Sequence, residues 1–138
     1  MTNRALAQSY LFKARKRLKA LEVLLAEESY SDVVREAQEL VELALKGILR
    51  EMGVDPPKQH DVGGLLLEMV HLLPPEVARH APRMARVSRW LRKEREFALY
   101  GDVDFVPTEE YTRKDAERAL RDARFVLRMA ERVIPEQG

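Results

Sequence analysis

Residues 30–53, YSDVVREAQELVELALKGILREMG, carry the pattern that decides the fold. Their apolar side chains recur at steps of three and four residues, which places them on one face of an α-helix. These residues are Val33, Val34, Ala37, Leu40, Val41, Ala44, Leu45, Ile48 and Leu49. Ser29 suits the N-cap, with Asp32 in capping-box spacing. Gly53 suits the end of the helix, which Pro56-Pro57 prevents from continuing.

The same helical period runs through the rest of the chain. We expect helices over about 6–25, 30–52, 61–70, 75–100 and 112–133. Pro82 is expected to fray or kink the fourth helix, and Thr112 forms a capping box with Asp115 at the start of the last. Residues 101–111 are the longest expected loop, and no alternating strand pattern is present. Short connections favour antiparallel neighbours, so residues 1–138 are predicted to form a single all-α domain, an antiparallel up-and-down helical bundle of four to five helices.

The composition predicts a cytoplasmic protein that does not associate with membranes. Among 138 residues, 24 basic side chains nearly balance 23 acidic ones, so the formal charge is +1. This balance argues against a protein that simply coats nucleic acid, although a local patch can still bind it. Cysteine is absent, which excludes disulfides and thiolate metal sites. No apolar run approaches the roughly 20 residues that cross a membrane, and no signal-peptide core is present.

The histidines do not have the spacing of a metal site. His60, His71 and His80 form no pair with a ligand-type spacing, and no His-Glu-x-x-His motif exists. A phosphate-binding glycine loop and the nucleophile elbow of a hydrolase are also missing. We therefore expect neither a metal ion nor a cofactor.

Arginines recur at short intervals before Tyr100-Gly101 and the long loop. They are Arg79, Arg83, Arg86, Arg89, Arg92 and Arg95. The last three are close enough on a helix to form a local cationic strip, which suits contact with the phosphates of a nucleotide or RNA. The alternative is a solvated face whose arginines pair with acids such as Glu94 and Glu96, and the residues alone favour this alternative.

A second polar group lies on the helix of residues 30–53. Gln38, Glu42 and Lys46 are four residues apart, so they project on one side. Glu42 before Lys46 is the favourable order for an intrahelical ion pair, which we interpret as an exposed salt bridge. Trp90 is expected in the core or in an interface rather than as a stacking platform.

Several motifs, taken in order, resemble one known family. They are Tyr10, Ala14 and Leu18 in the first helix; Tyr30-Ser-Asp-Val-Val, Ala37-Gln38, Val41-Glu42 and Ala44-Leu45-Lys46 in the second; Gly53-Val-Asp-Pro-Pro with His60-Asp61-Val62; and Leu99-Tyr100-Gly101-Asp102 with Pro107-Thr108-Glu109-Glu110-Tyr111. Over nearly the whole chain this series resembles the HEPN family of small prokaryotic helical proteins. The resemblance implies an up-and-down bundle that usually dimerises. It also implies a gene often placed beside a minimal nucleotidyltransferase, as a two-component or toxin–antitoxin pair.

The resemblance also implies what a catalytic member needs. Many active members are metal-independent ribonucleases, in which an arginine is followed after four to six residues by a histidine and often by a tyrosine. The histidine would act in acid/base chemistry and the arginine would hold phosphate. Here Arg92 and Tyr100 stand at workable positions, but Ala98 occupies the place of the histidine. No histidine follows Arg95 either, and His60 could serve only through space.

Three functions stay open. The preferred one is a HEPN binding module, non-catalytic or very weakly catalytic, that acts as a homodimer and as the helical partner of a minimal nucleotidyltransferase. Its nucleotide- or RNA-facing groove would contain Arg89, Arg92, Arg95, Tyr100 and Gly101, and Tyr100 could accept a nucleotide from the partner. The second is a divergent metal-independent ribonuclease toxin, with Arg92 and Tyr100 as catalytic candidates. The third is a purely structural dimeric interaction protein.

Overall fold

The computed structural model describes residues 3–56, 58 and 61–136, and its regular elements are helices. In chain order they are α1 (Asn3–Ala26), α2 (Tyr30–Glu51), α3 (Val62–Glu68), the 3-10 helix η1 (Val70–Leu72), α4 (Pro75–Ala78), α5 (Ala81–Leu99), α6 (Pro107–Glu110) and α7 (Arg113–Val133). Strands are absent from the described residues, where the only β-type pairing is a bridge between Asp102 and Phe105. No helix of this described part is long and apolar enough to span a membrane. The predicted all-α fold is confirmed.

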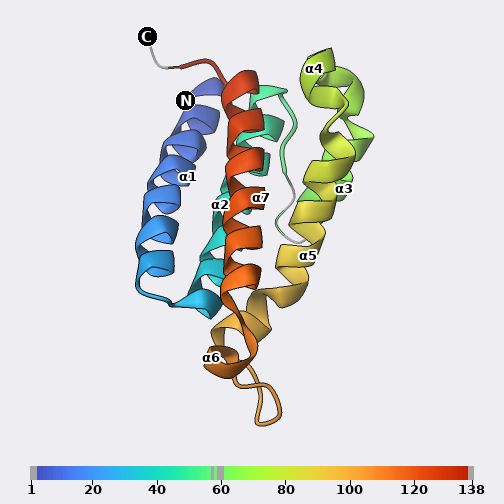
Figure 1. Cartoon of the computed structure of the whole chain (residues 1–138). Coiled ribbons are helices and arrows are strands. Elements are labelled where there is room, and N and C mark those ends of the chain that lie inside the picture. Colours follow the sequence, from blue (N-terminus) through green and yellow to red (C-terminus); the bar gives the residue numbers. More distant parts are fainter. Residues whose placement is uncertain (1–2, 57, 59–60, 137–138) are drawn as a thin grey trace.

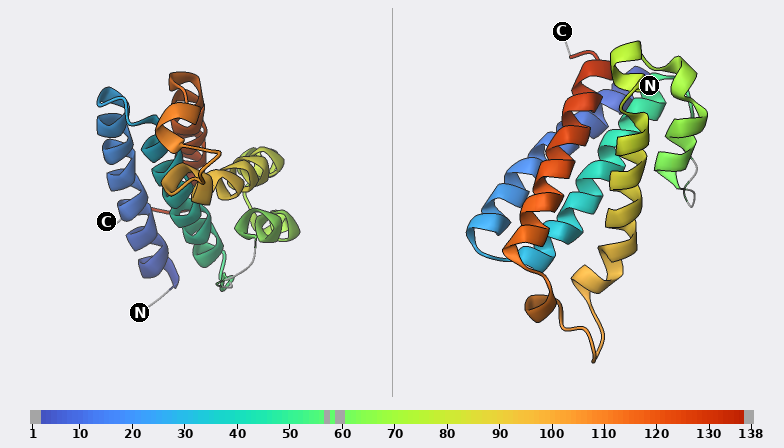
Figure 2. Two further views of the ribbon diagram at one scale, coloured as in Figure 1. Left: turned by 90° about the horizontal axis from the view of Figure 1, so that it is seen from below. Right: turned by 45° about the vertical axis from the view of Figure 1, so that its right-hand side comes forward.

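Four long helices, α1, α2, α5 and α7, run side by side as an up-and-down bundle (Figure 1). The helix α2 lies in the middle, where it contacts α1, α5 and α7. The shorter α3 packs against α5, and α4 contacts α7 (Figure 2). The one-turn helix α6 lies at the opposite end of the molecule from α4, just before α7 begins (Figure 1).

The core is built around α2. All nine of its apolar residues that the sequence places on one face are buried. They share a single core cluster with Leu21 of α1, Leu91 of α5 and Val126 of α7. Each buried Val, Leu or Ile side chain contributes about 1.5–3 kcal/mol relative to exposure to water. The central position of α2 therefore explains why its pattern decides the fold.

The two expected N-caps differ in their hydrogen bonds. At α7 the capping box is complete, since Asp115 N donates to Thr112 Oγ1 (3.3 Å) and Thr112 N donates to Asp115 Oδ2 (2.9 Å). Ser29 occupies the N-cap position of α2 but makes no side-chain bond to the helix backbone. Its hydroxyl donates instead to Asp32 Oδ2 (2.6 Å). The Thr112 prediction is confirmed, whereas Ser29 caps by position only.

The segment predicted as one helix over about 75–100 is two helices. The first, α4, ends at Ala78, and α5 begins at Ala81 after Arg79 and His80. Pro82 lies in the first turn of α5, where its missing N–H costs nothing, so it neither frays nor kinks a continuous helix. The expected loop 101–111 also contains a helical turn, α6.

Candidate functional site

A polar groove lies between α2 and α5. Its first part is a cavity of about 400 Å³ lined by Gln38, Glu39, Glu42 and Lys46 of α2, by Lys58, and by Arg92 and Arg95 of α5. A second cavity, of about 470 Å³, shares Arg92 and Arg95 and adds Arg35, Glu96, Leu99 and Tyr100. We refer to the two cavities together as the α2–α5 groove. Two segments far apart in the chain therefore share one site.

The helical spacing of α2 supplies one wall of the groove. Gln38, Glu42 and Lys46 are one turn apart, and all three line the first cavity. Lys46 Nζ lies 3.5 Å from Glu42 Oε2, so the predicted ion pair forms. Both side chains are half-buried, which places the pair in the wall of the groove instead of on open surface.

Ion pairs tie the two walls together. Glu39 Oε1 lies 3.0 Å from Arg35 Nη1 on its own helix and 3.6 Å from Arg95 Nη2 on α5. Arg92 Nη1 lies 3.8 Å from Oδ1 of Asp61, the N-cap residue of α3. The two arginines of α5 thus reach across to acids of α2 and α3, whose carboxylates hold the guanidinium groups at the groove.

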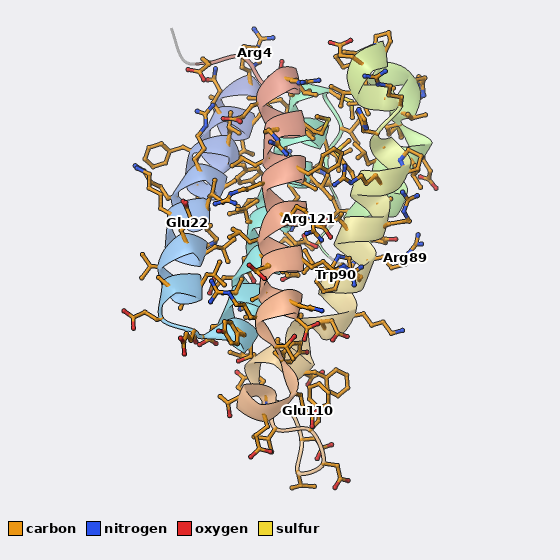
Figure 3. All side chains as sticks on the ribbon, viewed as in Figure 1. Arg4, Glu22, Arg89, Trp90, Glu110 and Arg121 are labelled. Atoms are coloured by element: carbon orange, nitrogen blue, oxygen red, sulfur yellow. The ribbon has the colours of Figure 1, made fainter. Side chains whose placement is uncertain are left out.

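The predicted strip of arginines does not share one surface. Arg92, Arg95 and Tyr100 line the α2–α5 groove. Arg89 is exposed, is absent from the groove lining, and projects outward from α5 (Figure 3). Tyr100 is 76% exposed, so its hydroxyl is accessible at the mouth of the second cavity. The cationic surface relevant to the groove is therefore narrower than the sequence suggests.

Gly101 allows a tight backbone turn after α5. Its φ of +68° lies in the left-handed region that favours glycine, just after the end of α5. A Cβ atom at this position would overlap the carbonyl oxygen of Phe105 and lie 2.6 Å from Cδ of Pro107. The missing side chain is therefore needed for the chain to turn back on itself after Tyr100.

This helical arrangement matches known proteins. The family model described as "HEPN domain" matches residues 7–133. The chain belongs to the HEPN family. The crystal structure of ST0689, an archaeal HEPN homologue, has the same fold, with a TM-score of 0.68 and 22% identity over 94% of this chain and 98% of that one. "Putative toxin MJ1304" of Methanocaldococcus jannaschii is 27% identical over 138 residues, which cover 95% of this chain and 90% of the relative.

In this HEPN chain the position expected for a catalytic histidine faces the core. Ala98 is 1% exposed and belongs to the core cluster. Its methyl group can neither donate nor accept a proton. The neighbouring Arg95 and Tyr100 reach the groove, whereas residue 98 lies on the inner side of α5. No acid/base group enters the groove from this position.

The described histidines lie elsewhere. His71 is exposed in η1, and the ring of His80 packs edge-on against Phe125, with 5.6 Å between the ring centroids. His60 lies outside the described residues, so the structure does not place it. In the described parts of the chain no group of three or more His, Cys, Asp or Glu side chains is arranged to hold a metal ion.

Three groove residues were not singled out by sequence reasoning. They are Arg35, Glu39 and Lys58. Arg35 and Glu39 have the same four-residue spacing as Glu42 and Lys46, although their charges stand in the reverse order, so the spacing of opposite charges along the helix could have revealed them. Lys58 follows α2 in an irregular connection, and its position carries no periodic signal.

A third cavity, of about 290 Å³, lies where α5, α6 and α7 meet, and several of its polar groups have partners inside the protein. Trp90 is half-buried; its Nε1 donates to Asp122 Oδ2 (3.1 Å), and Arg118 lies 4.1 Å from the centroid of its ring (Figure 3). Tyr111 Oη donates to Glu94 Oε1 (3.2 Å). Burial, with the negative charge of Glu94 adding to it, raises the pKa of the Tyr111 phenol well above its usual value. These contacts stabilise the junction and engage Trp90, in agreement with its expected structural role.

Proposed function

We propose that this HEPN protein is a binding module of a two-component, toxin–antitoxin-like system, and that its α2–α5 groove holds a phosphate of a nucleotide or RNA. The observation that carries the proposal is the convergence of Arg92 and Arg95 on the groove. Guanidinium groups present donors in a planar fork that matches phosphate oxygens. With Lys46 and Lys58, the first cavity has four basic and two acidic side chains in its wall.

The position of Ala98 supports binding over cleavage. The alternative, a divergent ribonuclease toxin, needs an acid/base group beside the phosphate. Ala98 supplies none, and its side chain is packed into the core. The groove retains the groups that hold a phosphate, so binding without cleavage is the better-supported function.

Binding of a single-stranded RNA oligonucleotide, followed by fluorescence anisotropy over a salt series, tests the groove. Arg92→Ala and Arg95→Ala should each weaken binding and reduce the slope of log affinity against log salt by about 0.7–1, the value of one phosphate contact. Arg89→Ala is the matched control, because it removes the same charge from the outer side of the same helix. Equal losses in all three variants would contradict a specific groove. Cleavage of RNA by the wild type without metal, lost in Arg92→Ala, would support the ribonuclease instead.

A minimal nucleotidyltransferase is the proposed protein partner. Membership of the HEPN family supports it, as does the likeness to a relative whose name describes a toxin. Co-expression of the chain with the product of the adjacent gene should yield a complex that survives purification. If the neighbouring product is no nucleotidyltransferase, or if the two proteins separate, this part of the proposal fails.

Tyr100 is the proposed acceptor of a nucleotide from that partner. Its side chain is 76% exposed, so the hydroxyl can enter the active site of another protein. In the reaction, the phenol would give up its proton to solvent or to a base of the partner, and Oη would attack the α-phosphate of a nucleoside triphosphate. The bond from the α-phosphorus to the oxygen that bridges to the β-phosphate would break, so pyrophosphate would leave and a phosphodiester would remain on Tyr100. Intact-mass spectrometry of the co-expressed protein should show one added nucleotidyl group, absent from Tyr100→Phe. An unmodified mass in both proteins would reject this role.

A second copy of the chain is proposed to cover the end of α5 and the turn that follows. Exposed apolar side chains outside the α2–α5 groove gather in this part of the chain: Phe97, Val103 and Val106. Contiguous apolar patches on a monomer commonly mark interaction sites. The turn also carries Asp102 and Asp104, while α5 carries exposed arginines. Each copy thus offers both charges, which suits a two-fold symmetric dimer.

A further inference from the structure

A second basic surface lies on the opposite side of α5 from the groove. It consists of exposed arginines on α7, on α5 and just before α5, and we refer to it as the α5–α7 basic face. Its members are Arg79, Arg83, Arg86, Arg121, Arg128 and Arg132. Arg83 and Arg92 are nine residues apart, about two and a half turns of an α-helix, so this face and the α2–α5 groove point in opposite directions.

Helical spacing places the arginines of the face in two rows. On α7 the members follow steps of four, three and four residues once Phe125, which lies between the first two arginines, is included. Before and within α5 the steps are four and three residues. Such steps keep side chains on one side of a helix. Trp90 of α5 and Arg121 of α7 lie on the side of the molecule where these two helices run next to each other (Figure 3).

Two aromatic rings hold the rows together. The guanidinium of Arg83 on α5 lies 3.7 Å from the ring centroid of Phe125 on α7. In the reverse direction, the guanidinium of Arg118 on α7 lies 4.1 Å from the ring centroid of Trp90 on α5. A guanidinium that stacks on a ring keeps its N–H groups in its own plane, where they can donate to an anion. Arg83 is therefore already oriented for an anion on the outer surface.

The positive charge of the face is not neutralised within the described part of the chain. None of its arginines forms an ion pair with a described acid. Two acids of α7 are engaged elsewhere. Asp122 accepts a hydrogen bond from Trp90 and lies 3.8 Å from Arg118, and Glu131 pairs with Arg15 of α1. The face therefore presents a row of unpaired cations to solvent, which favours an anionic ligand.

The lack of exposed apolar side chains indicates the kind of ligand. Phe125 is only 6% exposed, and the large exposed apolar side chains of the described residues lie on α1, α3 and η1, or from the end of α5 onward. A protein partner buries an apolar centre at its interface, whereas interfaces with nucleic acid are polar and strongly positive. An array of guanidinium groups without an apolar centre therefore fits phosphates better than it fits a protein surface.

We propose that the α5–α7 basic face binds the phosphate backbone of an RNA that is longer than the α2–α5 groove alone can hold. The contacts go to phosphates, so they carry no base preference. The inference shares the RNA ligand with the proposed function, and it goes beyond that function by adding a second surface with residues of its own. A long RNA should therefore bind more tightly than one that only fills the groove.

The test measures the fluorescence anisotropy of two single-stranded RNA oligonucleotides, of about 4 and about 20 nucleotides, over a salt series. For the long RNA, Arg86→Ala combined with Arg121→Ala should reduce the slope of log affinity against log salt by about 1.4–2, the value of two phosphate contacts. Both side chains are exposed and form no ion pair with the described residues, so the fold should be unchanged. The short RNA should bind this variant like the wild type. Arg83→Ala should likewise reduce the slope for the long RNA, by about 0.7–1.

Lys13→Ala combined with Arg89→Ala is the matched control. It removes two positive charges from exposed positions that belong neither to the face nor to the lining of the groove. The slope for the long RNA should stay at the wild-type value. An equal loss in this control would overturn the inference, because net charge alone would then set the affinity. Labelled poly-glutamate is the probe for an acidic protein. If it binds as tightly as the long RNA and is weakened equally by Arg86→Ala with Arg121→Ala, the face recognises acidic polypeptides and the inference is wrong.

Failure of the inference and failure of the proposed function give different results. If Arg92→Ala weakens binding of the short RNA while Arg86→Ala with Arg121→Ala leaves the long RNA unaffected, the groove binds RNA and the basic face does not. If the long RNA is weakened only by the variants of the face, and Arg92→Ala changes neither RNA, the inference stands and the groove does not bind RNA. If the wild type binds neither RNA, both fail.

Discussion

The side chain of Ala98 is 1% exposed, although Phe97 and Leu99 on either side of it are exposed. The rotation of the helix places residue 98 toward the core and its two neighbours toward solvent. A motif that is read only by its spacing does not contain this information. Position 98 therefore lacks two things that a catalytic histidine needs. The imidazole is absent, and α5 also directs this position away from the groove.

Ala98→His should destabilise the protein without creating a ribonuclease. An imidazole inserted into the packed core should lower the free energy of unfolding by about 1–3 kcal/mol. Urea denaturation measures this loss, and incubation with RNA in the absence of metal measures cleavage. Leu99→His serves as the control, because residue 99 is exposed and faces the groove. It should change stability by less than about 0.5 kcal/mol. An Ala98→His variant that is stable and cleaves RNA would contradict this account.

Tyr111 should make stability depend on alkaline pH. Burial and the charge of Glu94 raise the pKa of its phenol in the folded state. Above the unfolded pKa of about 10, the unfolded chain therefore binds fewer protons than the folded one, and stability falls by up to about 1.4 kcal/mol per pH unit. In Tyr111→Phe this contribution is absent, so the free energy of unfolding should decline less steeply between about pH 9.5 and 11. Parallel curves for the two proteins would show that the phenol ionises freely in the fold.

At the scale of single residues the sequence predicts only part of the groove. The grouping of Gln38, Glu42 and Lys46 follows from helical spacing alone. The approach of Arg95 to Glu39 depends on which faces of α5 and α2 pack together. Because the two residues lie far apart in the sequence, no local spacing predicts this contact.

Among the helices, α2 and α7 offer a matched comparison of N-caps. Thr112→Ala removes a side-chain acceptor from a complete capping box and should cost about 1 kcal/mol of stability. Ser29→Ala removes a hydroxyl that makes no bond to the helix backbone, so its cost should be about 0.3 kcal/mol. Urea denaturation of both variants measures the difference. Equal losses would mean that the hydrogen bond from Asp115 N to Thr112 Oγ1 contributes nothing.

Helices of two or more turns are predicted well from sequence, and one-turn helices are not. The four long helices each repeat the apolar period over several turns, so α1, α2, α5 and α7 were all anticipated. The one-turn helices α4 and α6 are too short to show a period. The sequence predicts a fray or a kink at Pro82, because a proline can end a helix or begin one. Only the break at Arg79 and His80 decides between these two roles.

For the whole molecule, the order and direction of the helices can be predicted from the sequence, but the α2–α5 groove cannot. Short connections between long helices leave an antiparallel bundle as the simple solution, and the structure adopts it (Figure 1). The α2–α5 groove depends on a contact between residues 35–46 and residues 92–100. The apolar pattern specifies that the two helices meet, whereas their relative rotation, which decides the polar lining, arises from detailed packing.

The proposed dimer gives a prediction for the whole assembly. Val103 is 90% exposed at the tip of the turn after α5, in the patch proposed to meet the second copy. Val103→Asp would place a charge in that apolar contact at a cost of about 1–3 kcal/mol, which weakens dimerisation on the order of ten- to hundred-fold. Analytical ultracentrifugation over a concentration series measures this shift toward monomer. Val23→Asp, at a valine that is 62% exposed on α1, is the matched control and should leave the dimer intact. If Val23→Asp dissociates the dimer and Val103→Asp does not, the second copy binds along α1 instead.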